Sequence, residues 1–293
     1  MGVIPTALSL FVLGPSGTNS HEAAKKFTQG LYYRYEINFC RTNREVLESC
    51  LKGGMGVVPI ENGSAGYVGE VIKFWLSQKY SSLLKVIGEM TLPISHHLIV
   101  RSSVKSVEEI KEIISHPHAL EQCTQFLQKL NVRTIPAAST AEAARQVSQS
   151  RTHRKAAIAS IFAARTFGLK ILRQKIENSP DNATCFHLVG HSISLPTGKD
   201  KTAVLFRLPG KENKYGSLLD ALSVLKEEKV NMSRIHSIPL GTLGSYAFYC
   251  EFDCHSEDKS GKRIIEKLKK ESENELLLLG SFPRFCERKE GEK

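Results

Sequence analysis

Short apolar runs alternate with helical stretches from Thr6 to about Gly190. The apolar runs predict strands at Ala7–Leu13, Met55–Ile60, Leu83–Met90, His97–Val100, Val132–Pro136, Ala156–Ala159 and His187–Val189. Apolar residues at helical spacing predict helices at Ser20–Phe27, Thr42–Leu51, Val107–Ile114, Pro117–Leu130, Thr140–Ser148 and Ile161–Phe167, the second opened by a Thr42–Glu45 capping box. Strands that alternate with helices are typical of βαβ units and parallel sheets. We therefore expect an α/β domain.

The pattern changes after His191–Lys201, a segment of Gly, Ser, Pro, Thr and Lys with little to pack. Beyond it, strands are predicted at Thr202–Leu208, Met232–Ile238, Tyr246–Phe252 and Leu276–Gly280, and helices at Ser217–Glu228 and Gly261–Ser272. The resulting order βαββαβ is the ferredoxin-like arrangement. The sequence thus predicts two domains, one at residues 6–190 and a smaller one at residues 201–285.

Composition narrows the class of protein. The 293 residues are 41% hydrophobic and 24% charged, which is typical of a globular chain, and no apolar run approaches the roughly 18 residues of a membrane span. The net charge of +10 is compatible with nucleic acid, a membrane surface or small anions. Because the basic residues are scattered and interleaved with Glu, we favour solvated surfaces over a nucleic-acid or membrane partner.

Cysteine usage and the opening segment bear on localisation. Seven cysteines without a C-x-x-C pair suit a reducing compartment better than a disulfide scaffold. Met1–Leu13 has no basic residue before its apolar stretch, which argues against a secretory signal. We therefore expect a cytoplasmic protein.

Three short motifs lie at predicted strand ends, where open α/β sheets bind ligands. They are Gly14-Pro-Ser-Gly-Thr18, Glu61-Asn62, and Asp181-Asn-Ala-Thr-Cys-Phe186, which leads into the strand His187–Val189. The glycines and the following helix N-terminus of the first motif could bring backbone N–H groups to a ligand. Each motif has a plain alternative, respectively a strand-to-helix turn, a capping pair and a Ser/Thr/Asn turn.

Metal binding and cysteine nucleophiles are not indicated. The histidine and cysteine groups are His96-His97, His116 with His118, and Cys250 with Cys254-His255, and none has zinc-finger or H-E-x-x-H spacing. Adjacent residues in a strand point to opposite faces, which applies to His96-His97 and to Cys254-His255. Neither Cys123 nor Cys185 lies in a nucleophile signature. We therefore expect no metal site.

The order of the motifs carries more information than any one of them. Along the chain stand Gly14-Pro-Ser-Gly-Thr18 with Ser20-His-Glu-Ala-Ala24, Val58-Pro-Ile-Glu-Asn62 with Gly66-x-Val68, Ser115-His-Pro-His-Ala-Leu120, Ser139-Thr-Ala-Glu-Ala-Ala144, Ala156-Ala-Ile-Ala-Ser160 and Asn182-x-Thr184-x-Phe186. This series resembles prephenate dehydratase. The second domain resembles the ACT regulatory module in Tyr215-Gly-Ser-Leu218, Asn231-Met-Ser-Arg-Ile235 with Pro239, Tyr246-x-Phe248 and Leu279-Gly-Ser-x-Pro283. The resemblance covers Ala7 to Pro283.

The resemblance implies a catalytic domain of two lobes like type 2 periplasmic binding proteins, which closes on prephenate. The implied reaction is decarboxylation with loss of the ring hydroxyl, giving phenylpyruvate, carbon dioxide and water, with no cofactor or metal. Thr184 matches the catalytic threonine, which would assist the departing oxygen. The matching substrate-binding positions are Thr18, Glu61, Asn62, Ser139, Asn182, Cys185 and Phe186. Basic groups and helix N-termini should hold the two carboxylates.

The resemblance also implies regulation by L-phenylalanine and a homodimer or homotetramer. The effector-binding positions are Gly216, Ser217, Leu218, His236 and Ser237. The chain departs from the family pattern at the motif Thr-Arg-Phe, where Cys185 replaces the arginine, and at Glu-Ser-Arg-Pro, which reads His236-Ser237-Ile238-Pro239. Asn19 and Gly63 are further departures, from an aromatic residue and a serine. Two alternatives therefore stay open: a catalytically weak or inactive amino-acid-binding homologue, and an arogenate dehydratase or non-aromatising prephenate decarboxylase.

Overall fold

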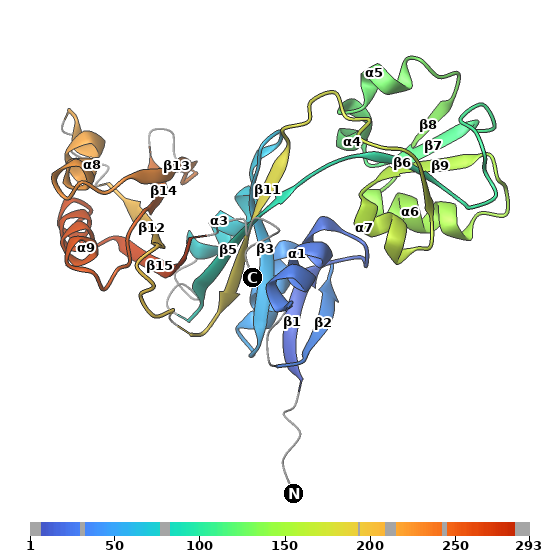
Figure 1. Cartoon of the computed structure of the whole chain (residues 1–293). Helices are drawn as coiled ribbons and strands as arrows, with labels where there is room; N and C mark the ends of the chain where they lie inside the picture. Colours follow the sequence, from blue (N-terminus) through green and yellow to red (C-terminus); the bar gives the residue numbers. More distant parts are fainter. Residues whose placement is uncertain are drawn as a thin grey trace, which may run out of the picture. The chain divides into compact units, whose positions relative to one another are not determined.

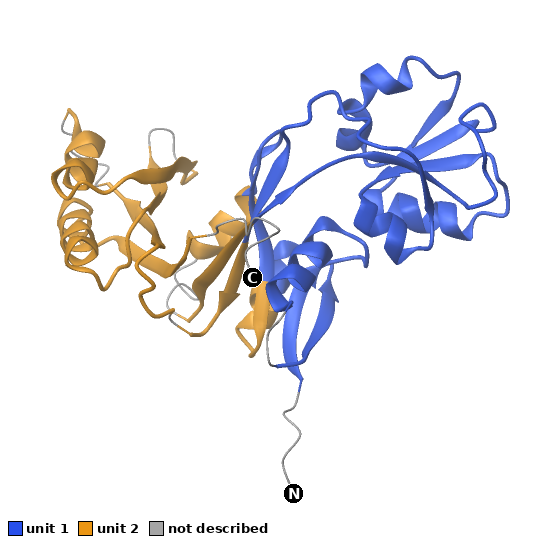
Figure 2. Cartoon of the chain, viewed as in Figure 1, with its two compact units in different colours: residues 1–46, 57–68, 91–186 blue, residues 47–56, 69–90, 187–293 orange. Residues whose placement is uncertain are grey.

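The computed structural model describes residues 7–29, 33–76, 83–192, 194–208, 215–241 and 245–284. The outer limits of the two predicted domains, Thr6 and Phe285, lie outside these residues. The chain divides into two compact units (Figure 2). Unit 1 contains residues 1–46, 57–68 and 91–186, and unit 2 contains residues 47–56, 69–90 and 187–293. The boundary between the units passes through single strands, including the one that carries Thr184.

The elements up to Gly190 alternate between strands and helices (Figure 1). The strands are β1 (Leu8–Leu13), β2 (Tyr35–Cys40), β3 (Met55–Asn62), β4 (Gly66–Tyr67), β5 (Lys85–Pro93), β6 (His97–Val100), β7 (Glu112–Ser115), β8 (Arg133–Pro136), β9 (Lys155–Ala159), β10 (Lys170–Arg173) and β11 (Ala183–Gly190). The helices are α1 (Asn19–Thr28), α2 (Asn43–Cys50), α3 (Gly69–Leu76), α4 (Pro117–Glu121), α5 (Thr124–Leu127), α6 (Thr140–Gln149) and α7 (Ile161–Thr166).

These strands form two sheets. The first has the order β2-β1-β3-β11-β5, with β4 paired to β3, and the second has the order β10-β6-β9-β7-β8. The expectation of parallel sheets is wrong in part, because β3 and β4 pair antiparallel in the first sheet and β6 pairs antiparallel with both neighbours in the second. Parallel pairing holds for β1 with β2 and for β7 with β8 and β9.

The second sheet has apolar packing on both faces. Leu98, Val100 and Ile158 pack with Cys123 and the partly buried Phe126, whereas Ile99 packs with the alanines of α6 and α7 on the other face. A strand buried on both faces has no polar side, and so its sequence is a continuous apolar run.

The predicted helix Val107–Ile114 is wrong for this reason: residues 112–115 form β7, whose Ile113 and Ile114 contact opposite cores. Four further elements, β2, β4, β10 and α3, were not predicted. The strand predicted at His187–Val189 begins at Ala183 instead, and β3 extends to Asn62. Glu61, Asn62, Thr184 and Cys185 therefore lie within strands.

The remaining elements are β12 (Asp200–Arg207), α8 (Ser217–Glu227), β13 (Met232–Pro239), β14 (Tyr246–Phe252), α9 (Lys259–Glu271) and β15 (Leu276–Pro283). Their antiparallel sheet has the order β13-β14-β12-β15, which is the ferredoxin-like topology predicted from the sequence. Both helices pack on one face, where Val204, Phe206, Cys250 and Phe252 form the core with Ile264 and Leu268. None of the helices in the described ranges is long and apolar enough to cross a membrane.

Candidate active site

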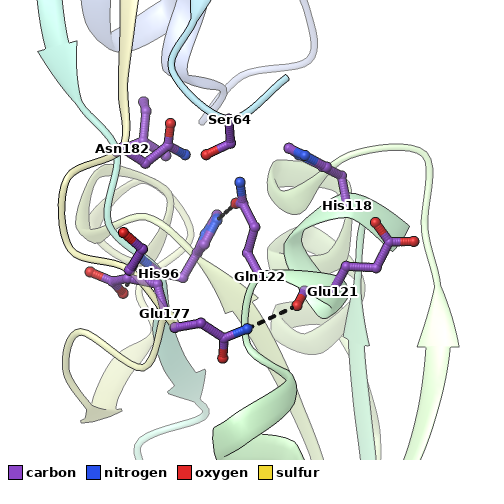
Figure 3. Close-up of a pocket in the computed structure, with 10 residues that line it drawn as sticks. Ser64, His96, His118, Glu121, Gln122, Glu177 and Asn182 are labelled. Carbon is purple, nitrogen blue, oxygen red and sulfur yellow. Dashed lines mark hydrogen bonds between the residues drawn. The ribbon is translucent and has the colours of Figure 1, made fainter. Parts of the chain in front are cut away.

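Two adjoining hollows open among the strand ends and helix N-termini of unit 1. The larger encloses about 340 Å³ and is lined by the starts of α1 and α6, by Asn62 and by Asn182, Thr184 and Phe186. The smaller, of about 250 Å³, is lined by Ser64, His96, His118, Glu121, Gln122, Glu177 and Asn182 among others (Figure 3). The two share His96, His118, Gln122, Asn182 and Ile94. The volume of the larger hollow lies at the lower end of the range of small-molecule sites, roughly 300–1,000 Å³.

Thr184 is oriented by Asn62. The Asn62 amide Nδ2 donates to Thr184 Oγ1 at 2.8 Å, to Asn182 Oδ1 at 3.1 Å and to the Ala183 carbonyl at 3.3 Å. Asn62 is itself held, because its Oδ1 accepts from the N–H groups of Ser64 and Ala65. Thr184 Oγ1 thus acts as an acceptor toward Asn62, and its hydroxyl hydrogen has no acceptor among the residues that the structure describes. That hydrogen is available to a ligand in the larger hollow.

Alternation along β11 decides which residues line this hollow. Asn182, Thr184 and Phe186 are two residues apart and line it, whereas Cys185 points to the opposite face of the strand. Cys185 is buried, with 7% of its surface exposed. Glu61 pairs with Tyr67 of β4 and is also absent from the lining described for this region. A substrate contact by Cys185 or Glu61 therefore stays a prediction that this geometry does not favour.

Two ten-residue helices begin at the larger hollow. Thr18 caps α1: its hydroxyl donates to the Leu13 carbonyl at 3.0 Å and accepts from His21 N–H at 3.2 Å. Ser139 caps α6 by accepting from Glu142 N–H at 3.0 Å. Both predicted binding residues thus use their hydroxyls to begin a helix. The free N–H groups of the first helical turns supply positive potential to an anion.

The Gly14–Thr18 segment is a tight turn held by His21. The Nδ1 atom of His21 accepts from Gly17 N–H at 3.1 Å, and its ring packs edge-on against Phe39 and Phe162. Gly17 has φ +88°, and a Cβ there would lie 2.8 Å from the Phe167 ring. The glycine is required by the turn and by this close approach. The segment therefore serves to position the N-terminus of α1.

The smaller hollow contains an imidazole and an amide that contact each other. His96 Nε2 lies 2.7 Å from Gln122 Oε1 (Figure 3). The His96 backbone N–H donates to Glu177 Oε2 at 2.9 Å. Burial lowers the pKa of His96 below its ordinary 6.5, although Gln122 and Glu177 act in the opposite direction. The ring is therefore neutral at neutral pH. Within the described ranges, the buried atoms Gln122 Nε2 and Glu177 Oε1 have no hydrogen-bond partner, so the amide can donate to a ligand and the carboxylate oxygen can accept from one.

His96, Gln122 and Glu177 were not among the predicted site residues. His116 and His118 belong to the quoted motif Ser115–Leu120 and line the larger hollow, but they had been considered only as metal ligands. The basic side chains expected to hold the substrate carboxylates are not part of the lining described for the larger hollow. No lysine or arginine lines the larger hollow within the described residues, and helix N-termini, of which two begin there, are the groups that would attract an anion.

The predicted effector residues lie in unit 2. Gly216 has φ +87° and precedes Ser217 and Leu218, which begin α8. His236 and Ser237 lie on β13, the edge strand of the ferredoxin-like sheet. Their part in effector binding stays a prediction.

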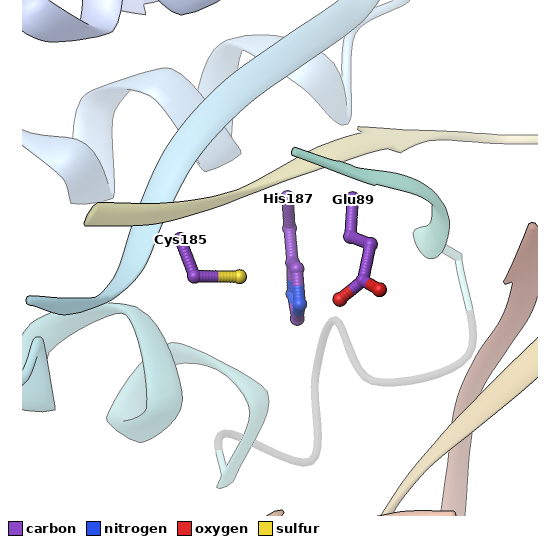
Figure 4. A group of neighbouring side chains, drawn as sticks. All are labelled: Glu89, Cys185 and His187. Carbon is purple, nitrogen blue, oxygen red and sulfur yellow. The ribbon is translucent and has the colours of Figure 1, made fainter. Parts of the chain in front are cut away.

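A cluster of potential metal ligands has a simpler explanation. Cys185 and His187 lie on the same face of β11, and Glu89 of β5 is close to His187 (Figure 4). The Glu89 carboxylate already pairs with the ammonium of Lys201 at 2.9 Å, so a cation occupies this position. Burial raises the pKa of the Cys123, Cys250 and Cys254 thiols to about 12, which disfavours their reactive thiolate forms.

Comparison with known proteins identifies the family. The family model for prephenate dehydratase matches residues 10–194. A prephenate dehydratase from Methanocaldococcus jannaschii is 35% identical over 274 residues, which cover 92% of this chain and 96% of that protein. Prephenate dehydratase from Arthrobacter aurescens, solved in complex with L-Phe, has a TM-score of 0.81 and 31% identity over 94% of this chain and 90% of that one.

A second solved structure has the same TM-score with a different activity in its name. GqqA, described as a novel type of quorum quenching acylase, has a TM-score of 0.81 and 25% identity, and covers 94% of this chain and 98% of that chain. The family model, the 35% identity and the Arthrobacter structure nevertheless agree with one another and with the motif order. The chain belongs to the prephenate dehydratase family.

Proposed function

We propose that this chain is a prephenate dehydratase, a carbon–oxygen lyase that converts prephenate to phenylpyruvate in L-phenylalanine biosynthesis. The observation that carries the proposal is the state of Thr184: its oxygen accepts from Asn62, and its hydrogen is left for a ligand in the larger hollow. The named relatives and the family match support the same reaction.

The reaction requires two contributions from the protein: a hydrogen-bond donor to the departing oxygen, and groups that bind the dianionic substrate. As the carboxylate carbon leaves as carbon dioxide, its bonding electrons complete the aromatic ring and the hydroxyl departs, taking up a proton to become water. Thr184 would donate a hydrogen bond to that departing oxygen, where acid assistance contributes about 10²–10⁴-fold. Asn62 would fix the direction of this donation, because its amide occupies the threonine lone pair.

The substrate is a dianion, and the site must hold it without arginine or lysine in the lining described above. The N-termini of α1 and α6 would bind its carboxylates through backbone N–H groups of Asn19, Ser20, Thr140 and Ala141. The side chain of Phe186, which is 1% exposed, would form an apolar wall.

Residues 6–190 would form the two-lobed catalytic domain and residues 201–285 an ACT regulatory domain that binds L-phenylalanine. The βαββαβ order and sheet topology support the ACT assignment, and the Arthrobacter relative is a complex with L-Phe. Gly216, Ser217, Leu218, His236 and Ser237 would contact the effector. We further propose a cytoplasmic homodimer or homotetramer.

The test is turnover by the purified full-length chain. Prephenate is added, phenylpyruvate is read by its absorbance in alkali, and products are identified by NMR; arogenate is run in parallel. The matched control is Thr184→Val, which preserves shape and removes the hydroxyl. We expect phenylpyruvate from the wild type and a loss of about 10²–10⁴-fold in kcat for the variant. A product that retains the ring hydroxyl, turnover of arogenate alone, or no turnover at all would each reject the proposal.

A further inference from the structure

A group of charged and titratable residues lies in unit 2, outside the lining of the larger hollow; all of them are buried except Arg234, which is partly buried. It consists of Glu89 on β5, His187 on β11, Lys201 on β12, Arg234 on β13 and Glu251 on β14, named here the charge network. Lys201 Nζ lies 2.9 Å from Glu89 and 3.8 Å from Glu251. His187 Nε2 lies 3.3 Å from Glu251 Oε1, and Arg234 pairs with the same oxygen.

Glu251 is the centre of this network and is fully buried, at 0% exposure. Burial alone would raise its pKa, but His187, Arg234 and Tyr249 outweigh burial and lower it. The carboxylate therefore stays ionised and depends on its partners. Removing one partner of a buried charge leaves the other uncompensated, so the positions of these residues are mutually dependent.

The partners of Glu251 are distributed unequally between its two oxygens. Arg234, Tyr249 and His187 all lie on Oε1. Oε2 has no hydrogen-bond partner among the described residues, although the Lys201 ammonium is 3.8 Å away. A movement of Arg234 would release Oε1 to His187 and let the carboxylate turn toward Lys201. A second set of pairings around Glu251 would then replace the observed one, which is what a switching element requires.

The network also connects two functional segments along the chain. Arg234 precedes the predicted effector residue His236 by two positions on β13, so their side chains leave the same face of the strand. His187 follows Thr184 by three positions on β11 and is pinned against Phe282, with ring centroids 5.4 Å apart. A displacement of β13 therefore acts on Glu251 through Arg234, and a displacement of His187 acts on the strand that carries Thr184.

We propose that the charge network couples ligand binding at β13 and α8 to the position of β11, and thereby regulates the dehydratase site. This inference rests on the proposed function for the identity of the site that is regulated. The coupling element consists of Arg234 and His187, which both contact the Glu251 carboxylate. Neither residue would contact the substrate. Both are positioning residues, which act on Thr184 through the backbone of β11.

The test measures thermodynamic coupling between two probes in the full-length protein. The affinity of phenylpyruvate is measured by calorimetry without and with saturating L-phenylalanine, and the ratio of the two dissociation constants is the coupling factor. We expect about 5- to 150-fold for the wild type. Arg234→Gln and His187→Gln should each reduce the factor to within about twofold of unity, while L-phenylalanine still binds. Arg234→Lys should restore part of it.

The matched control is Arg207→Gln, which removes another Arg–Glu pair from the same sheet. Arg207 lies 3.6 Å from Glu275 and outside the network, and this variant should keep the wild-type factor. Thermal unfolding shows which variants fold. If Arg234→Gln does not fold, the coupling factors of Arg234→Lys and His187→Gln test the inference.

Wild-type coupling in His187→Gln, or a wild-type factor of unity, overturns the inference. If the chain shows no dehydratase turnover but His187→Gln still abolishes the coupling between the two ligands, the inference is supported and the proposed function is rejected.

Discussion

Replacing Asn62 with aspartate is a sharp test of how Thr184 is used. The substitution exchanges the Nδ2 donor, 2.8 Å from Thr184 Oγ1, for a carboxylate oxygen of similar size. The threonine hydroxyl would then donate its hydrogen to the carboxylate rather than to the substrate. The change reverses one hydrogen bond and leaves the shape of the hollow nearly intact.

The expected magnitude follows from that reversed bond. A hydrogen bond to a charged group contributes about 1.5–3 kcal/mol, which the hydroxyl must give up to reach the departing oxygen. That energy corresponds to a loss in kcat of about 10- to 150-fold. The added negative charge should also raise KM, because the substrate is a dianion. Thr184→Val should lose about 10²–10⁴-fold in kcat because the donor is absent altogether.

The assay is steady-state phenylpyruvate formation, with thermal unfolding of each variant as the control for folding. Thr184→Ser keeps the hydroxyl and should retain kcat within about tenfold. Because Asn62 acts through the threonine, Asn62→Asp should cost little further kcat in a Thr184→Val background. A kcat for Asn62→Asp within about threefold of the wild type, or fully additive losses in the double variant, would refute the assigned hydrogen-bond direction.

Three other outcomes follow from burial and packing. Cys185→Arg places a charge on the buried face of β11, so we expect a lower Tm and no gain in kcat/KM; a gain would show that this side chain reaches the substrate. Burial lowers the pKa of His21 and His96, so the unfolded chain binds more protons near their ordinary pKa of 6.5; urea unfolding should show stability falling as pH decreases through that value, and a flat profile from pH 7.5 to 5.5 would contradict it. Gly261→Ala puts a Cβ 2.0 Å from a backbone carbonyl oxygen and should lower stability by about 1–3 kcal/mol or more, whereas Gly69→Ala, with open space around it, should not; equal Tm values for the two variants would disprove the packing argument.

The ferredoxin-like part was predictable because its sheet has helices on one face only. Val204 and Phe206 of β12 pack against these helices. In α9, the buried Ile264, Ile265 and Leu268 alternate with exposed lysines, so the helical period is plain in the sequence. The sheet around β9 has apolar packing on both faces, so Ile110, Ile113 and Ile114 fit a helix as well as a strand, and the prediction there was wrong.

The candidate site was predictable only in part. The order of motifs singled out Asn62 and Thr184, yet the hydrogen bond between them joins residues 122 positions apart and no local spacing indicates it. Because residues 181–186 were interpreted as a turn, the alternation along β11, which places Thr184 and Cys185 on opposite faces, was not predicted. Local patterns could not identify Gln122 and Glu177, because their role as lining residues arises from strands and helices brought together by folding.

The two faces of β11 make insertions and deletions there unusually damaging. Thr184 and Phe186 face the larger hollow, and His187 contacts Glu251 from the other face. Removing one residue near Ala183 would shift the register by one position and exchange these faces. The lining of the larger hollow and the His187–Glu251 contact would then be lost together, so changes to this strand have to exchange side chains at constant strand length.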